Sequence, residues 1–291
     1  DVCSSDLNLL LRQGKLQDAV TSFRVATRTK SEILPTAFEL LWQASNGDIE
    51  PLKSLASKGV SSQLVLTQFL GEQSNYEAAV SIYRNIDAEA KLKSPSAAAF
   101  ISSLIKENRK TVARELWLDT ASKSIKGEHT DALIWNGGFE FDLPREFNHF
   151  DWVLSPSNYA RIGFDRGVAH GGNRSLKLAF AGRDTTKIEG EIKQLVILKP
   201  NVRYRLDCYA KTGNLVTPEG PRLALLGANG PLAVSSPVGA GSNDWQNLMV
   251  EFIAPAEAVM TYIAIVRIPR FSYDEPTQGT VWFDDFKLVE L

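Results

Sequence analysis

The spacing of apolar residues changes near residue 130 of this 291-residue chain, and that change limits what the chain can fold into. Before it, apolar residues recur every three to four positions, as in "LQDAVTSFRVAT" (16–27), which is the spacing of one helix face. After it, apolar and polar residues alternate in short segments separated by turn residues, which is typical of β-strands. The chain is also long for one domain. The sequence therefore predicts an α-helical domain over 1–130 and a β-sandwich domain over 131–291.

The helical part contains an internal repeat. Segments that start at Gly14, Ser74 and Asn108 share a turn, then a small residue, then an aromatic residue at the same offset, and a weaker copy starts at Gly47. The small and aromatic pairs are Ala19/Phe23, Ala79/Tyr83 and Ala113/Trp117. This spacing is typical of helical hairpin repeats, and the segment loosely resembles the tetratricopeptide family, whose fuller Trp, Leu-Gly and Pro pattern is degenerate here.

The second part reads as a series of short strands. Turn-rich stretches such as "KPNV" and "TPEGP" separate segments of alternating pattern, of which "RSLKLAFAG", "RYRLDCYAKTG", "WQNLMVEFIAP" and "TYIAIVRIP" are examples. Seven or more such strands predict an antiparallel β-sandwich of about 160 residues. Within it, we interpret Trp245 and Trp282 as core residues and Cys208 as a small buried apolar residue in a strand.

The last segment, "GTVWFDDF" (279–286), places two carboxylates side by side in a strand. With a period of two, Asp285 shares a face with Phe283, and Asp284 shares the opposite face with Phe286. One carboxylate is therefore expected on the buried face, where it requires a cation or several hydrogen-bond donors.

The motifs of the second part resemble one family when they are taken in order. These are "WNGGFE" (135–140), "GGNRSLKLAF" (171–180), "VILKPNVRYRLDCYAKT" (196–212), "DWQNLMVEFIAP" (244–255) and "GTVWFDDFKL" (279–288). Together they resemble carbohydrate-binding modules of the family 4 and 9 type, which are jelly-roll sandwiches related to galactose-binding-like domains. The resemblance implies a jelly roll that binds an oligo- or polysaccharide.

The same resemblance implies a structural Ca²⁺ that ties the first strand to the last. Its ligands in this sequence would be Glu140, the loop at Asn173, and Asp284, and Ca²⁺ takes six to eight oxygen ligands. In the alternative, Asp284 pairs with Arg174 or Lys177, or accepts backbone amides from the Gly-rich loop. A third interpretation makes Glu140 and Asp284 the acid and base of a glycoside hydrolase, but residues that close a sandwich at its chain ends are badly placed for a cleft.

A sugar site needs aromatic rings that stack on the sugar and polar groups at its edge. Trp152, which is also a candidate core residue, and Tyr159 lie in a long irregular segment. Phe271 and Tyr273 lie between two predicted strands, and Arg161, Arg267, Arg270 and Asp274 are candidates for the polar rim. The predicted carbohydrate site thus consists of Trp152, Tyr159, Arg161, Arg270, Phe271 and Tyr273.

Composition excludes several kinds of function. A net charge of −2 and a pI near 6.0 give no electrostatic reason to bind nucleic acid. Two distant cysteines, Cys3 and Cys208, make neither a zinc pattern nor a disulfide framework. No run of 18 apolar residues predicts a membrane span.

These observations favour a non-catalytic binding protein in which a helical scaffold, which would recruit a protein partner, is fused to a carbohydrate-binding sandwich. The alternative is a purely structural interaction scaffold whose sandwich has no sugar ligand. An enzyme is not expected, because no nucleophile–base pair, phosphate loop or metal-hydrolase motif occurs. The start at Asp1 lacks Met and a signal sequence, which we interpret as a mature or trimmed chain. A periplasmic, cell-envelope or extracellular location, linked to a bacterial exopolysaccharide, fits this combination.

Overall fold

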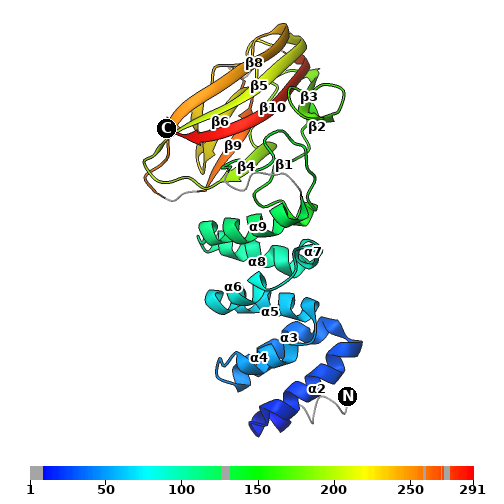
Figure 1. Ribbon diagram of the computed structural model, residues 1–291. Helices are drawn as coiled ribbons and strands as arrows, with labels where there is room; N and C mark the ends of the chain where they lie inside the picture. The colour runs from blue at the N-terminus through cyan, green and yellow to red at the C-terminus, as the bar shows by residue number, and fades with distance from the viewer. Residues whose placement is uncertain (1–8, 126–131, 258–259, 270, 272–275) are drawn as a thin grey trace. The chain divides into compact units, whose positions relative to one another are not determined.

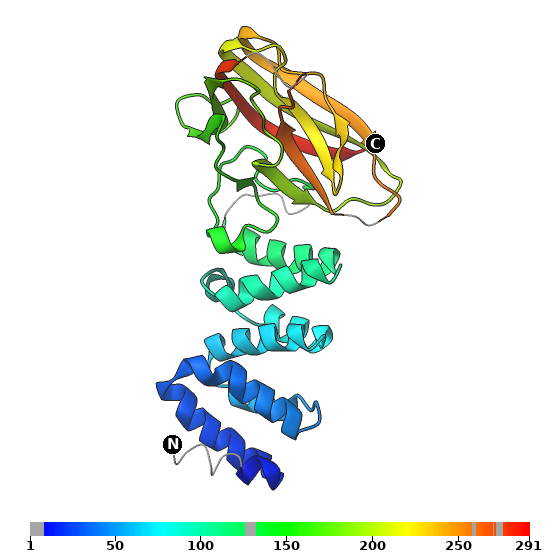
Figure 2. The same ribbon diagram turned by 180° about the vertical axis from the view of Figure 1, so that it is seen from behind.

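The computed structural model describes residues 9–125, 132–257, 260–269, 271 and 276–291, and it divides into two compact units, 1–124 and 125–291 (Figures 1 and 2). The first unit is helical and the second consists of β-strands, as the change in period predicts. The domain boundary predicted between residues 130 and 131 lies outside the described residues.

The helical unit is built from antiparallel helix pairs. Short turns connect its elements, and Pro35 and Pro95 stand in first turns, where the missing N–H costs no hydrogen bond. Its elements are α2 (Leu16–Thr29), η1 (Ser31–Ile33), α3 (Leu34–Ala44), α4 (Glu50–Ala56), α5 (Val60–Glu72), α6 (Tyr76–Arg84), α7 (Ala88–Leu92), α8 (Pro95–Lys106) and α9 (Lys110–Ser124). Among the described residues, no helix is both long and apolar enough to span a membrane.

Four turns of the helical unit share one backbone geometry. Gly14, Asn46, Ser74 and Asn108 all have a left-handed backbone, with φ of 68°, 52°, 59° and 58°. The residue after each donates its N–H to the carbonyl five positions earlier, which ends the preceding helix (2.8–3.0 Å). The weaker copy therefore begins at Asn46, one residue before the predicted Gly47. The small and aromatic residues of the other three copies are at most 4% exposed.

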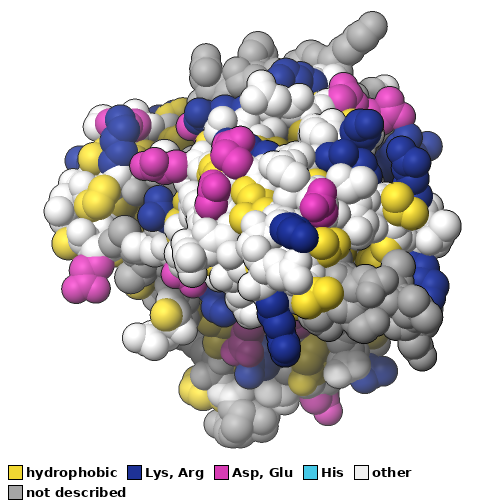
Figure 3. Space-filling view, turned by 90° about the horizontal axis from the view of Figure 1, so that it is seen from below, with side chains coloured by type: hydrophobic (Ala, Val, Ile, Leu, Met, Phe, Trp, Pro, Cys, Tyr) yellow, Lys and Arg dark blue, Asp and Glu magenta, His cyan; other side chains and the backbone are white. Residues whose placement is uncertain are grey.

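Both kinds of charged side chain are present on one face of the molecule. Seen from below, Lys and Arg side chains and Asp and Glu side chains all lie on this face (Figure 3). That view therefore offers no basic face of the kind that attracts a phosphate backbone.

The second unit is a sandwich of two antiparallel five-stranded sheets. Sheet A has the order β1-β4-β9-β6-β7, and sheet B has the order β2-β3-β10-β5-β8. The strands of sheet A are β1 (Val153–Leu154), β4 (Ile192–Val196), β6 (Arg222–Gly227), β7 (Gly230–Val234) and β9 (Thr261–Val266). Those of sheet B are β2 (Ala160–Asp165), β3 (Ser175–Arg183), β5 (Arg203–Val216), β8 (Gly241–Ile253) and β10 (Thr277–Glu290).

The core lies between the two sheets and is formed by alternate residues of each strand. Cys208 is completely buried there, as predicted, and burial raises the pKa of its thiol well above the usual range. Trp245 and Trp282 are not in this core, so both predictions were wrong. In β8 the buried residues are Leu248, Val250 and Phe252, so Trp245, an odd number of positions away, faces outward. Trp282 also faces outward, and its indole Nε1 donates to Asp165 Oδ2 at 3.0 Å.

The expected alternation fails at the two carboxylates of β10. Phe283 and Phe286, three positions apart, both lie in the core, because the pairing of β10 with β5 shifts between Asp284 and Lys287. Asp285 has a φ of 52° in this β-bulge. The extra residue turns both carboxylates away from the apolar core face. A strict period of two would have placed one of them among the apolar residues.

Candidate functional site

Asp284 is the fully buried carboxylate of the bulge. Its Oδ2 accepts the backbone N–H groups of His170 (2.8 Å) and Gly171 (3.2 Å), and its Oδ1 accepts that of Asp285 (2.8 Å). Burial nevertheless raises the pKa of Asp284 to about 6, because desolvation of the charge outweighs these hydrogen bonds. The loop at 170–171 is thereby tied to the last strand.

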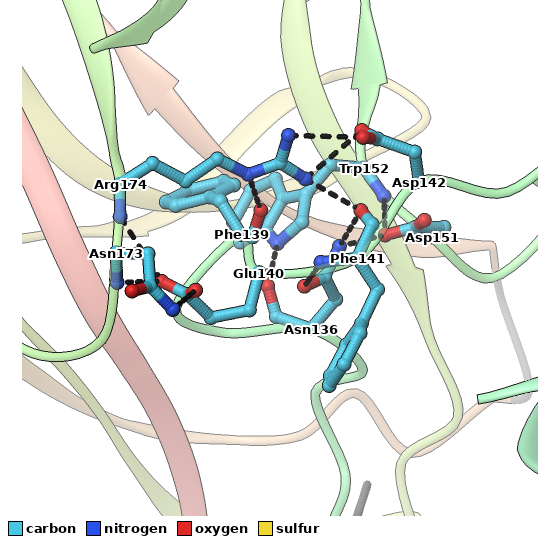
Figure 4. Close-up of polar contacts among 9 residues, drawn as sticks. All are labelled: Asn136, Phe139, Glu140, Phe141, Asp142, Asp151, Trp152, Asn173 and Arg174. Carbon is cyan, nitrogen blue, oxygen red and sulfur yellow. Dashed lines mark hydrogen bonds and ion pairs between the residues drawn. The ribbon is translucent and has the colours of Figure 1, made fainter. Parts of the chain in front are cut away.

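Glu140 anchors the other end of the same loop. Its Oε1 accepts the backbone N–H groups of Asn173 (2.9 Å) and Arg174 (3.2 Å), and its Oε2 accepts the Asn173 Nδ2 amide (3.1 Å; Figure 4). Carboxylates and loop amides therefore bind one another directly. This is the alternative in which the Gly-rich loop supplies backbone amides, and it is confirmed for Asp284.

Arg174 and Lys177 do not pair with Asp284, so that part of the alternative was wrong. The buried Arg174 guanidinium contacts Asp142 (2.9 Å) and the Phe141 carbonyl (2.8 Å), and its Nε donates to the Phe139 carbonyl (Figure 4). Lys177 instead pairs with Asp165 at 2.9 Å. Because Arg174 binds one carbonyl within the "GFE" motif and one directly after it, it fixes the 139–142 segment against β3.

The expected calcium ligands can be compared with this geometry. A Ca²⁺ site directs oxygens at the ion, whereas the loop directs N–H donors at Glu140 and Asp284. The Asn173 side chain also presents its amide nitrogen to Glu140. Among the described residues, no group of three or more His, Cys, Asp and Glu is placed to hold a metal. The donor set as it stands does not fit the cation, and calcium binding stays a prediction of the resemblance.

The glycoside-hydrolase interpretation requires carboxylates that reach a substrate. Asp284 has no exposed surface and is covered by the loop at 170–171. Its raised pKa therefore reflects burial and not an acid poised in a cleft. This pair of carboxylates gives no support to a hydrolase.

A pocket of about 290 Å³ lies beside the Arg174 cluster, between the irregular segment 136–156 and β2. Aromatic groups from Phe141, Trp152 and Phe164 line it together with the polar side chains of Arg145 and Asn148, among others. The complete lining is Asn136, Phe141, Asp142, Leu143, Arg145, Asn148, Asp151, Trp152, Val153, Leu154, Ser155, Pro156 and Phe164. A pocket with a mixed apolar and polar lining suits a small ligand that has both kinds of surface.

The walls of the pocket are held in place by the core. The Trp152 ring packs on Phe139 (5.0 Å between centroids) and on Phe286 (4.7 Å), and its Nε1 donates to the Asn136 carbonyl at 3.1 Å. Asn136 also holds Phe141 through hydrogen bonds to both its N–H and its carbonyl (3.0 and 2.9 Å; Figure 4). The pocket is thus supported by ordered side chains.

The predicted sugar residues are scattered in the structure. Trp152 is only 6% exposed, so it lines the pocket as a core residue and offers no free ring face. Tyr159 is half-buried just before β2, Arg161 is exposed on β2, and Phe271 is exposed. Arg270 and Tyr273 lie outside the described residues, as does Asp274. Of the predicted residues that the structure describes, Trp152 alone lines the pocket.

The prediction that Arg267 belongs to the polar rim of a sugar site was wrong. Its guanidinium is buried and donates to the backbone carbonyls of Thr186 (2.5 Å) and Glu219 (3.2 Å). It therefore joins loops next to sheet A. Phe141, Arg145 and Phe164 were missed, because no local pattern shows that the residues after "GFE" fold back against β2.

Comparisons with known proteins give similar solved structures but no family. No family model matches the chain, and no curated protein sequence is similar to it at a significant level. Similar solved structures include a family 16 carbohydrate-binding module, at 22% identity over 54% of this chain and 99% of that one, with a TM-score of 0.38. A family 4 carbohydrate-binding module is 19% identical over 54% of this chain and 99% of that one, with a TM-score of 0.39. A Stig cyclase from Fischerella sp. TAU is 20% identical over 55% of this chain and 96% of that one, with a TM-score of 0.39. Binding modules and an enzyme thus have similar scores, and at these values no activity is transferred.

Proposed function

We propose that this chain is a non-catalytic binding protein whose sandwich binds a sugar unit of an oligo- or polysaccharide in the pocket at 136–156. The observation that carries the proposal is the mixed lining of this pocket. Apolar rings of Phe141 and Phe164 suit the C–H face of a sugar, and Arg145 and Asn148 suit its hydroxyl groups. The small volume, about 290 Å³, favours one sugar unit of a chain over a long buried segment.

The carboxylates that line the pocket already have partners. Asp142 is already paired with Arg174 at 2.9 Å, and the Asp151 carboxylate accepts the Trp152 N–H at 2.7 Å. A bound polyol would exchange hydrogen bonds with these groups without leaving an unpaired charge.

The helical unit provides the second half of the proposed function. Two hollows of about 370 and 510 Å³ share Tyr76, Glu77 and Arg109, and the Arg109 guanidinium lies 4.3 Å above the Tyr76 ring. Tyr76 is only 8% exposed, whereas Glu77 and Arg109 are exposed, so these hollows offer charged side chains to a protein partner. If the sandwich binds no sugar, this surface favours the alternative function of a protein-interaction scaffold. A bacterial envelope or exopolysaccharide setting belongs to the same proposal.

The test is a glycan array probed with the whole chain, followed by calorimetry with the oligosaccharide that binds. Arg145→Ala is expected to weaken binding about 10-fold or more, since a hydrogen bond to a charged group contributes about 1.5–3 kcal/mol. Phe141→Ala is expected to weaken it through the lost ring contact.

The matched control is Arg166→Ala, because Arg166 is exposed in the same unit but is not part of the pocket lining. Its affinity should equal that of the unaltered chain. A folded protein that binds no glycan on the array, or that binds one equally well after Arg145→Ala, would refute the proposed pocket.

A further inference from the structure

A second group of aromatic rings lies on the outer face of sheet B, at the edge opposite to β2. Tyr209 of β5 lies between the buried Cys208 and Ala210, and it therefore points away from the core. Trp245 of the edge strand β8 also points outward. Both rings are partly exposed. We call His170, Tyr209 and Trp245 the outer aromatic patch.

The three rings contact one another in a defined arrangement. The His170 ring stacks on Tyr209, with 3.7 Å between centroids and 14° between planes, and it meets Trp245 edge-on at 5.5 Å and 68°. His170 belongs to the loop that Asp284 holds through backbone N–H groups, so the ring is positioned by the β10 bulge. The patch is thus preorganised, and a ligand would bind it without ordering loose side chains first.

Two pairs of polar side chains surround the patch. His170 Nδ1 lies 2.6 Å from Asp285 Oδ2, and Lys211 Nζ lies 2.6 Å from Asp244 Oδ1. Side chains of all four groups remain accessible, from 31% exposed for His170 to 84% for Asp244. The rim therefore offers several accessible hydrogen-bond donors and acceptors, and the charge of Lys211 is paired with that of Asp244.

We infer that the outer aromatic patch is a second ligand site, which takes an uncharged sugar ring of a glycan chain. The exposed part of Trp245 supplies an apolar face, and Lys211, Asp244 and Asp285 supply partners for hydroxyl groups. A neutral ligand suits a rim in which Lys211 is already paired with Asp244, whereas an anion would meet the carboxylates of Asp244 and Asp285. The site does not rest on the proposed pocket, because Phe164 of the pocket and Trp245 lie on strands at opposite edges of sheet B.

The inference is tested by isothermal titration of the whole chain with neutral hexasaccharides of β-1,4-glucan, β-1,4-xylan, β-1,4-mannan and β-1,3-glucan. Arg145→Ala weakens the proposed pocket about 10-fold or more, so the tighter binding that remains reports the patch. In that background Trp245→Ala is expected to weaken binding at least 10-fold, and Trp245→Phe, which keeps a ring, should stay within about 3-fold.

Met249→Ala is the matched control, because Met249 lies on the same face of β8, is 47% exposed and should not contact a ligand of the patch. Its affinity should not change. Residual binding that is unaffected by Trp245→Ala, no binding of any hexasaccharide in the Arg145→Ala background, or tighter binding of a polygalacturonate hexamer would overturn the inference. Binding that is unchanged by Arg145→Ala but is lost when Trp245→Ala is added would refute the proposed pocket and support the second site.

Discussion

The turns of the helical unit and the closure of the sandwich both pair backbone polar groups. They differ in how far apart along the chain the paired groups lie. Each helical turn is completed by an N–H that reaches five residues back, as from Asn75 to Leu70 at 2.8 Å. In the sandwich, the loop at 170–174 bonds to Glu140, over 30 residues earlier, and to Asp284, which is 114 residues from His170.

The difference concerns what a short stretch of sequence can specify. A turn with a left-handed residue forms from its own neighbours, so four copies with different residues give the same hydrogen bond. The sandwich closure exists only after three distant segments have met, and loop-closure entropy must be overcome before those contacts form. We therefore expect changes in the closure to have larger effects than changes in the helical turns.

The largest effect is expected from Gly137→Ala. A Cβ at this position would meet the backbone carbonyl of Phe286, whose own N–H donates to the Gly137 carbonyl at 3.0 Å. Because backbone on both sides is fixed by the bulge, we expect a loss of about 4 kcal/mol or more in the free energy of unfolding of the sandwich. Urea denaturation followed by circular dichroism measures it.

Gly163→Ala is the control in the same unit, since an added Cβ there meets nothing within 4 Å and φ is not in the left-handed region. It should change stability by less than about 1 kcal/mol. Equal effects of the two substitutions would show that the closure is not the rigid element that the structure indicates.

The next largest effect is the pH dependence that Asp284 gives to the free energy of unfolding of the sandwich. The folded carboxyl keeps its proton up to a pKa of about 6, whereas the ordinary value is 3.8. Between these values the folded chain binds more protons than the unfolded one, so the contribution of Asp284 is full below pH 4 and is lost as pH rises through 6. Asp284→Asn does not titrate, so the unaltered chain should lose up to about 3 kcal/mol relative to this variant between pH 4 and 7.

This comparison is made by urea denaturation at several pH values in the presence of EDTA. If the stability difference between the two proteins is constant over this range, or grows in favour of the unaltered chain as pH rises, the carboxylate is stabilised by its amide donors more than burial destabilises it.

A smaller effect is expected in the helical turns. Ser74 has φ of 59°, a conformation that glycine adopts without strain, so Ser74→Gly should raise the stability of the helical unit by up to about 1 kcal/mol. Gly14→Ala, at φ of 68° with open space around it, should lower it by a similar amount. Thermal unfolding monitored at 222 nm detects both. A loss of stability in Ser74→Gly would mean that the serine side chain contributes to the turn.

The smallest expected effect is that of calcium. Because amide donors already bind Glu140 and Asp284, the melting temperature of the sandwich should differ by less than about 1 °C between excess CaCl₂ and EDTA. Magnesium serves as the control for ionic strength. A rise of several degrees that is specific to calcium, and absent in Glu140→Gln, would show that an ion replaces these donors, as the family resemblance implies.

Much of the architecture was predictable because it depends on local patterns. The period of 3.6 and the turn spacing gave the helical hairpins and their buried Ala/aromatic pairs, and alternation gave the strands of the sandwich. The outward position of Trp245 could also have been predicted, because Trp245 lies three positions before the buried Leu248 and alternation therefore places it on the opposite face. The family resemblance led us instead to expect a Trp in the core. Phe164 and Arg145 could not be grouped in advance, because their proximity depends on an irregular segment.

By itself, the sequence determined three features: the two kinds of secondary structure, the turns between the helices, and the resemblance of the second half to a jelly roll. Each of these depends on residue spacings that are only a few positions long. Only the tertiary structure decided how the adjacent carboxylates Asp284 and Asp285 are accommodated. A one-residue bulge with φ of 52° at Asp285 keeps Phe283 and Phe286 in the core and turns the acids to a loop more than 100 residues away. No local period encodes that outcome, because it depends on amide donors that approach Asp284 only when the sandwich has closed.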